Sequence, residues 1–322
     1  MPTLVPAAVL RTALQLLSLL RPATAAAYQG QALPMVFKGS GAPGMAGTPP
    51  AAIPRRIWTY WNGATLDPVV AQCVDNWRRQ CPDYSVEVLH AGNLERFVAP
   101  GDLPPGFLDL AAAKQADWLR LYLVRHHGGF WLDASIVLTR SLDWLVAEQQ
   151  AQGSEFAGFF LEGFTHDARW PVVESWAFGA PAHAPFVTAW QQEFHLALIT
   201  QGTQDYLAEL RARPWGAELL QGIPDPEYLL IHVAAQQVLR RDNGFHLSLY
   251  SAEDTAYFYQ KALRWKWYLL YPRLCLAPAQ AAVAPLVKLR GGERRHFSEL
   301  LAHHGGASPG SLWQRACAAR SG

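Results

Sequence analysis

The chain lacks an excess of charge of either sign, a long uninterrupted hydrophobic run and a dense set of cysteines. Lys and Arg total 27 against 26 Asp and Glu, so the net charge of +1 gives no general attraction to nucleic acid or to an acidic membrane. Of the 322 residues, 50% are hydrophobic and only 16% are charged, which excludes an intrinsically disordered chain. No apolar run reaches the roughly 18 residues of a membrane-spanning helix. We therefore expect a globular protein that binds any anionic ligand through a local site.

The few cysteines show no pattern that would make a structural framework. Cys73, Cys81, Cys275 and Cys317 have no Cys-x-x-Cys spacing, and no paired histidines lie at zinc-finger distance. The sequence therefore predicts four reduced thiols in a reducing compartment.

Residues 1–27 are apolar but lack the basic start of a secretory signal, because no Lys or Arg precedes Arg11. Arg11, Gln15 and Ser18 share one stripe of a predicted helix whose remaining surface is apolar. Such a helix packs on the body of the protein, on a partner or flat on a membrane surface, and the sequence leaves these alternatives open. We expect a cytoplasmic protein, either free or peripheral to the inner face of the membrane.

Gly and Pro interrupt residues 38–54, which predicts a linker between an N-terminal extension over residues 1–50 and one domain over residues 51–322. After the linker, residues 57–61 read as a strand, 66–80 as a helix and 84–90 as a second strand. This order predicts an α/β fold with a largely parallel sheet.

The stretch from residue 111 to 133 is the most informative part of the chain. Residues 111–127 predict a helix, Gly128-Gly129 its end, and Phe-Trp-Leu-Asp a buried strand with Asp133 at its carboxyl end. Ligands of open α/β sheets bind at that edge, so Asp133 is a candidate for chemistry, although it could also cap its own turn. Asp117 and Arg120, three residues apart on the helix, taken alone predict an ordinary ion pair.

Four blocks together resemble a known family over about residues 51–290. They read IPRRIWTYWNG, ADWLRLYLVRHHGGFWLDAS, VVESWAFGAP and PLVKL. The sequence is similar to the capsular polysaccharide synthesis proteins, relatives of sugar-transferring enzymes with an Asp-x-Asp motif on a GT-A fold. The resemblance implies a GT-A-like, Rossmann-type α/β fold with a mixed, mainly parallel sheet flanked by helices. It also implies a hexosyltransferase-type enzyme that uses a UDP- or GDP-sugar and a polysaccharide or other glycan acceptor.

The resemblance assigns roles to matching residues of this chain. Trp58 and Tyr60 would open the nucleotide pocket, and Asp117 and Arg120 would hold hydroxyls of the donor sugar. Asp133, the first motif carboxylate, would act in catalysis and contact the ribose, the sugar or a metal.

The motif departs from Asp-x-Asp, because Ser135 stands where a second carboxylate would bind the metal. The resemblance therefore implies only a weak Mn²⁺ or Mg²⁺ site at Asp133 and Ser135, completed by the donor's diphosphate. Lys288 is a candidate to neutralise the departing diphosphate, or else a solvated charge. The neighbouring basic residues, which could close over the same group or face solvent, are Arg290, Arg294, Arg295 and His296.

Glu174 is the second catalytic candidate. Strand alternation places Val172, Glu174 and Trp176 on one face, where a carboxylate needs a partner or a purpose. It could accept a proton from the acceptor hydroxyl, orient the donor, or simply lean into water. His232, predicted on a helix with Tyr228 on the same face, is either an acceptor-side residue or structural.

Two other functions stay open at this stage. A glycoside hydrolase would also be rich in Trp and would use two carboxylates. A catalytically inactive glycan-binding protein of the same fold is compatible with the missing second motif carboxylate.

Overall fold

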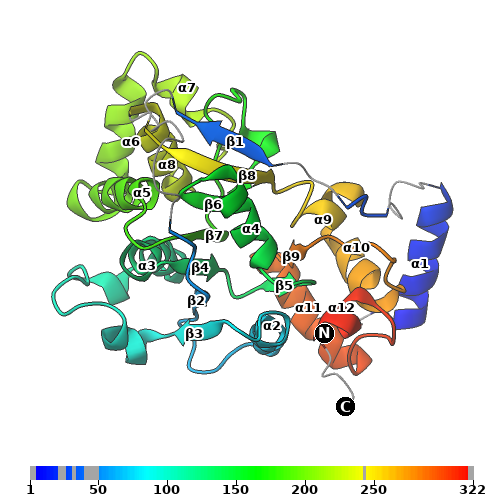
Figure 1. Cartoon of the computed structure of the whole chain (residues 1–322). Helices are drawn as coiled ribbons and strands as arrows, with labels where there is room; N and C mark the ends of the chain where they lie inside the picture. The colour runs from blue at the N-terminus through cyan, green and yellow to red at the C-terminus, as the bar shows by residue number, and fades with distance from the viewer. Residues whose placement is uncertain (1–4, 21–26, 31–33, 40–50, 242–243, 318–322) are drawn as a thin grey trace.

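A mixed seven-stranded sheet forms the centre of the computed structural model, which describes residues 5–20, 27–30, 34–39, 51–241 and 244–317 (Figure 1). In spatial order its strands are β1 (Met35–Lys38), β8 (His246–Ser251), β6 (Phe156–Phe160), β7 (Ala177–Ala180), β4 (Gly129–Leu132), β2 (Arg56–Tyr60) and β3 (Ser85–Leu89). β1 and β7 run antiparallel to their neighbours, and the other five strands share one direction. β5 (Ile136–Leu138) and β9 (Leu286–Lys288) form a separate antiparallel pair.

Helices cover the sheet and continue beyond it. α3, α5 and α8 pack together, while α4 lies against β6 and β8 and α2 against β3 and β5. The helices are α1 (Ala7–Leu20), α2 (Pro68–Gln80), α3 (Ala112–His127), α4 (Asp143–Gln152), α5 (Pro185–His195), α6 (Thr203–Ala212), α7 (Gly216–Leu220), α8 (Leu230–Arg241), α9 (Phe258–Ala262), α10 (Trp267–Tyr271), α11 (Gly291–His304) and α12 (Leu312–Cys317). The predicted fold class, an α/β architecture with a mixed, mainly parallel sheet flanked by helices, is confirmed.

Local sequence explains why the first elements form where they do. Asp67 caps α2 by accepting from the backbone N–H of Val69 at 2.9 Å, and Pro68 occupies the first turn, where its missing N–H costs nothing. β2 is buried along nearly its whole length, as is all of β4, which fits strands covered on both faces. The predicted strands and helices over residues 57–132 are therefore confirmed.

Two predictions about local structure are wrong. Glu174 lies before β7, directly after Val173, which forms an isolated antiparallel bridge with Phe160. The Glu174 N–H donates to Phe159 O at 2.8 Å as part of that bridge, and no strand continues through Glu174. Tyr228 lies in the turn before α8, where its N–H donates to the Asp225 carboxylate at 3.1 Å, so it does not share a helix with His232.

The N-terminal extension is attached to the body. β1 pairs along its full length with β8, so the sheet already begins before the predicted boundary at residue 50. α1 lies against the Pro272–Leu276 turn and buries Leu14, while Arg11 and Gln15 are exposed as predicted; the side chain of Ser18 lies outside the described residues.

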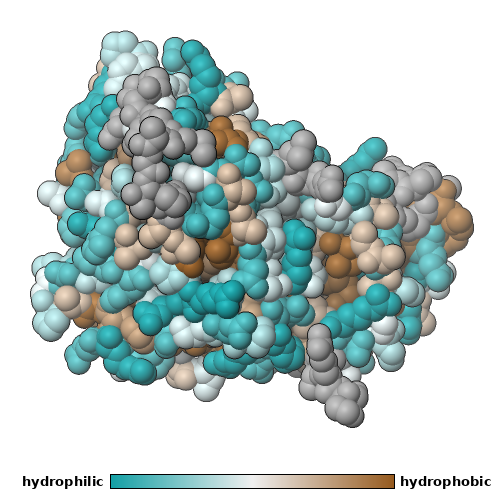
Figure 2. Space-filling model, in the orientation of Figure 1, coloured by the Kyte–Doolittle hydropathy of each residue, from teal (hydrophilic) through white to brown (hydrophobic). Residues whose placement is uncertain are grey.

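The stripe of α1 opposite the buried Leu14 is apolar and faces outward. Val9 and Leu16 are about half exposed and Leu19 is 79% exposed. Figure 2 shows this hydrophobic surface at the edge of the molecule formed by α1. Among the described residues, no helix is both long enough and apolar enough to span a membrane.

All four cysteines are buried and free, as predicted, and burial raises the pKa of each thiol.

Candidate functional site

A cleft of about 1190 Å³ opens at one edge of the central sheet. Because β2, β4, β6 and β8 share one direction, their carboxyl ends meet at this edge, and the segments that follow them line the cleft. β7 runs the opposite way, so the residues preceding it reach the same edge. The lining residues that come from these strand ends are Tyr60, Trp61, Asn62, Asp133, Ala134, Ser135, Leu161, Glu162, Gly163, Glu174, Ser175, Trp176 and Glu253.

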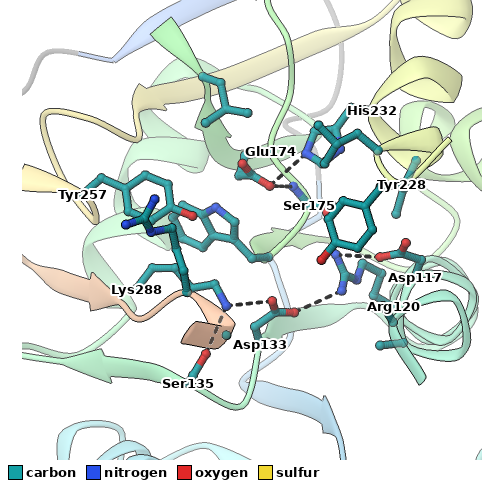
Figure 3. Close-up of a pocket in the computed structure, with 18 of the residues that line it drawn as sticks. Asp117, Arg120, Asp133, Ser135, Glu174, Ser175, Tyr228, His232, Tyr257 and Lys288 are labelled. Carbon is teal, nitrogen blue, oxygen red and sulfur yellow. Dashed lines mark hydrogen bonds and ion pairs between the residues drawn. The ribbon is translucent and has the colours of Figure 1, made fainter. Parts of the chain in front are cut away.

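Asp117, Arg120 and Asp133 form one connected group on the cleft wall (Figure 3). The Arg120 guanidinium lies 3.2 Å from Asp117 Oδ1 and 3.1 Å from Asp133 Oδ1, and it also donates to the Ser175 hydroxyl. Burial raises the pKa of Asp117, against the opposing effect of Arg120. The predicted convergence of helix and strand residues is present, and the pair on α3 is more than a surface ion pair.

Lys288 joins this group from a distant part of the sequence. β9 pairs with β5 so that Lys288 stands opposite Ile136, next to the Asp133-Ala134-Ser135 turn. Its Nζ lies 2.9 Å from Asp133 Oδ2 and 3.1 Å from Ser135 Oγ. Burial alone would raise the pKa of Asp133, but Lys288 and Arg120 outweigh it and hold that pKa below its usual range. Lys288 is therefore a buried cation of the site and not a solvated charge.

Glu174 and His232 meet on another side of the cleft. His232 Nε2 donates to Glu174 Oε1 over 2.9 Å, and the Ser175 N–H donates to the same oxygen at 2.8 Å. Both side chains are buried, and within the described residues His232 Nδ1 has no hydrogen-bond partner. Glu174 is thus paired, as a buried carboxylate must be, and it still lines the cleft.

The predicted basic cluster divides into two parts. Arg290 and Arg294 line the cleft at the start of α11, where Arg290 Nε donates to Glu293 and Arg294 Nη1 donates to Asp67. The Arg294 guanidinium also lies 4.9 Å from the centre of the Trp61 ring. Arg295 and His296 do not line the cleft.

Trp58 does not take the predicted position at the nucleotide pocket. It is fully buried, donates from Nε1 to Gly128 O at 2.8 Å, and packs against Phe97 and His127. Its role is to hold β2 against the end of α3. Tyr60, two residues later at the end of β2, does line the cleft.

The residues at the motif fit a divalent metal poorly. Both oxygens of Asp133 already accept hydrogen bonds, from Lys288 on one side and from Arg120 and Trp131 Nε1 on the other. Ser135 accepts from Lys288 and donates to Leu289 O. Across the described ranges, no group of three or more His, Cys, Asp or Glu side chains could hold a metal ion.

Sequence reasoning missed several polar residues that line the cleft or support its walls. Gln115 accepts from the Tyr60 hydroxyl at 2.5 Å, and Glu253 accepts from the N–H groups of Glu162 and Gly163 at 3.0 Å each. Lys114 donates to the carbonyl of Tyr228 at 2.8 Å and so ties the start of α3 to the turn before α8. The sequence contained a signal for Gln115, because this residue lies one turn before Leu119 on the helix predicted over residues 111–127. No sequence pattern pointed to Glu253.

Comparison with known proteins supports the resemblance. Residues 48–196 match the model of a family described as capsular polysaccharide synthesis protein. The chain is 30% identical over 141 residues to the O-glycosyltransferase PaGT of Phomopsis amygdali, covering 39% of this chain and 34% of that protein. It is 30% identical over 165 residues to the O-glycosyltransferase braB of Annulohypoxylon truncatum, covering 45% and 38%. The matched region therefore spans little more than a third of these curated relatives.

Solved structures with a loosely similar arrangement are also glycosyltransferases. The PaToxG glycosyltransferase is 11% identical, with 96% of each chain covered and a TM-score of 0.35. The galactosyltransferase LgtC, in complex with donor and acceptor sugar analogues, is 10% identical, with 79% of this chain and 98% of that chain covered and a TM-score of 0.39. Likenesses this loose add nothing to the assignment of site residues.

Proposed function

We propose that this protein is a glycosyltransferase that moves a sugar from a nucleotide-sugar donor to a hydroxyl group of an acceptor. The observation that carries the proposal is the convergence of Asp117, Arg120, Asp133 and Lys288 in one cleft at the carboxyl edge of the sheet. The family match covers the first three of these residues. Carboxylates and a guanidinium suit sugar hydroxyls, and the cations suit a diphosphate.

The proposed reaction uses the two walls of the cleft for different tasks. The bond between the anomeric carbon and the diphosphate oxygen breaks, and that oxygen keeps the electron pair. The acceptor oxygen bonds to the anomeric carbon, and its proton passes to Glu174. His232 holds the Glu174 carboxylate in place through its Nε2–H, so it acts as a positioning residue.

The finer assignment follows the family. We infer a UDP- or GDP-sugar of the hexosyl type as donor and a cell-surface polysaccharide or related glycan as acceptor. Nucleotide sugars of this kind suit a cytoplasmic enzyme. The outward apolar stripe of α1 suits peripheral contact with a membrane surface, next to which such an acceptor would be built.

A glycoside hydrolase is less compatible with this geometry, since it needs a second carboxyl group that stays protonated and acts as the acid. Asp133 is bound by two cations that lower its pKa, so it cannot be that acid beside Glu174. An inactive glycan-binding protein would have no need for the buried cations that a diphosphate requires.

The test is a screen for hydrolysis and transfer over a panel of UDP- and GDP-sugars, with thermal stabilisation by UDP and GDP alone. We expect one nucleotide to raise the melting temperature and its sugar conjugate to be turned over. Asp133→Asn should lower turnover about 100- to 1000-fold, whereas Lys38→Met, on the exposed edge strand, should not change it. Stabilisation by oligosaccharides but by neither nucleotide would contradict the proposal.

A further inference from the structure

The place beside Asp133 where a motif of this type would take a divalent cation is filled by the ammonium group of Lys288. We infer that Lys288 is a built-in cation of the diphosphate site, so that this transferase binds and uses its nucleotide donor without a divalent metal. The inference rests on the proposed function, because it concerns the same donor site.

The two residues expected to share a metal share Lys288 instead. Lys288 Nζ donates to Asp133 Oδ2 at 2.9 Å and to Ser135 Oγ at 3.1 Å, as Figure 3 shows. Ser135 in turn donates to Leu289 O at 2.8 Å, which directs its lone pairs toward the ammonium. The neutral hydroxyl, a poor ligand for a hard cation, is a suitable acceptor for an ammonium.

A metal would also meet positive charge on both sides of Asp133. Arg120 Nη2 lies 3.1 Å from Oδ1, the oxygen that Lys288 does not use. A divalent ion at this carboxylate would have to displace one of the two cations and remain close to the other. The motif supplies a single carboxylate, and the described part of the chain has no group of three or more His, Cys, Asp or Glu side chains that could hold the ion against that repulsion.

Lys288 is fixed by its backbone as well as by its side chain. Its N–H donates to Ala256 O at 3.1 Å, and its carbonyl accepts from Gln260 Nε2 at 2.7 Å. These bonds anchor β9 from α9 and the loop before it, and the residue is 8% exposed. The ammonium is therefore preorganised, so it needs little rearrangement when charge appears on the leaving group.

The remaining donor capacity of Lys288 suits a diphosphate oxygen. An ammonium group has three N–H donors, and Asp133 and Ser135 accept two of them. When the anomeric carbon–oxygen bond breaks, the electron pair moves to the diphosphate oxygen, and the third donor can stabilise that charge. Arg290 and Arg294 line the same cleft and would meet the rest of the nucleotide's charge.

The primary experiment uses the unmodified protein. Binding of UDP and GDP is measured by calorimetry in excess EDTA and in Mn²⁺, and transfer is measured under the same two conditions. We expect the dissociation constant and the turnover to agree within about twofold between the two conditions, since the site's own cations supply the charge. Nucleotide binding that disappears in EDTA and returns with Mn²⁺ would overturn the inference and leave the proposed function intact. Absence of binding under both conditions would overturn both.

Variants separate the role of the charge from that of the fold. Lys288→Met should weaken nucleotide binding about 10- to 100-fold, the range for losing a hydrogen bond to a charged group. Lys288→Arg should recover part of this loss, and Lys38→Met, an exposed lysine on β1, should bind as the parent does. Lys288→Met with Ser135→Asp should bind nucleotide better in Mn²⁺ than in EDTA. If Lys288→Met binds nucleotide as tightly as the parent, the inference fails.

Discussion

The ion pair between Asp133 and Lys288 offers a direct test of the site's electrostatics through folding stability. The perturbation is a double-mutant cycle of Asp133→Asn, Lys288→Met and the combined variant. The Nζ to Oδ2 distance is 2.9 Å, and the side chains are 25% exposed for Asp133 and 10% for Lys288. The pair is therefore shielded from solvent on most of its surface.

The burial of the pair sets the expected magnitude. A hydrogen bond to a charged group contributes about 1.5–3 kcal/mol, whereas an exposed pair contributes about 0–1 kcal/mol. We expect a coupling free energy of about 1.5–3 kcal/mol at pH 7. Asp133→Asn alone should be the more damaging change, at about 3–5 kcal/mol, because it leaves both Lys288 and Arg120 facing a neutral group.

The pH dependence of this coupling has a definite sign. Lys288 and Arg120 hold the pKa of Asp133 below its usual range, so the folded state prefers the carboxylate. The stabilisation is then complete above the unfolded pKa of about 3.9 and is lost as the pH falls through the lower folded pKa. The coupling should thus be constant from pH 7 to about pH 5 and should decline only in stronger acid.

The assay is urea unfolding of the four proteins, followed by tryptophan fluorescence. Asp75 and Arg78 provide the matched control, because their N–O distance is also 2.9 Å but both side chains are more than half exposed. Their cycle should give no more than about 0.5 kcal/mol. A coupling between Asp133 and Lys288 as small as that of the control would refute the reasoning.

Three further predictions concern other parts of the molecule. Glu174→Gln should lower transfer about 100-fold and leave the nucleotide dissociation constant unchanged, and calorimetry showing equal loss of both would argue for a donor-side role. Trp58→Phe should cost about 1–3 kcal/mol in urea unfolding by leaving the carbonyl of Gly128 unpaired, without any effect on nucleotide binding. Leu16→Glu with Leu19→Glu should abolish sedimentation with lipid vesicles, and unchanged sedimentation would remove α1 from the membrane contact.

The part of the site predictable from sequence is the part that local structure builds. Asp117, Arg120 and Asp133 lie within 17 consecutive residues, and a helix, a glycine stop and a short strand suffice to bring them together. Periodicity and turn chemistry act over this range, so they identify such a group without knowledge of the remaining chain.

The partners that sequence could not pair are joined by long-range contacts. Lys288 and Asp133 are 155 residues apart in the sequence, and they meet only because β9 pairs with β5. Glu174 and His232, which also bond to each other, are 58 residues apart. The resemblance assigned Trp58 to the nucleotide pocket, and the local sequence pattern could not correct that assignment. Because β2 is buried along nearly its whole length, alternation along it does not indicate which residue borders the cleft.

Gly128, directly after α3, helps to set the geometry of the candidate site. Gly128 has φ +66°, and a Cβ there would lie 2.7 Å from Ala182 N and 2.9 Å from Pro54. Gly305, which ends α11, has nearly the same φ of +69° but nothing within 4 Å of its Cβ position. A left-handed conformation alone therefore does not account for Gly128, which must also let two other segments approach the backbone. That close packing sets the direction in which the chain passes from α3 into β4. It therefore sets the position of Asp133 relative to Arg120 and to the ammonium group of Lys288.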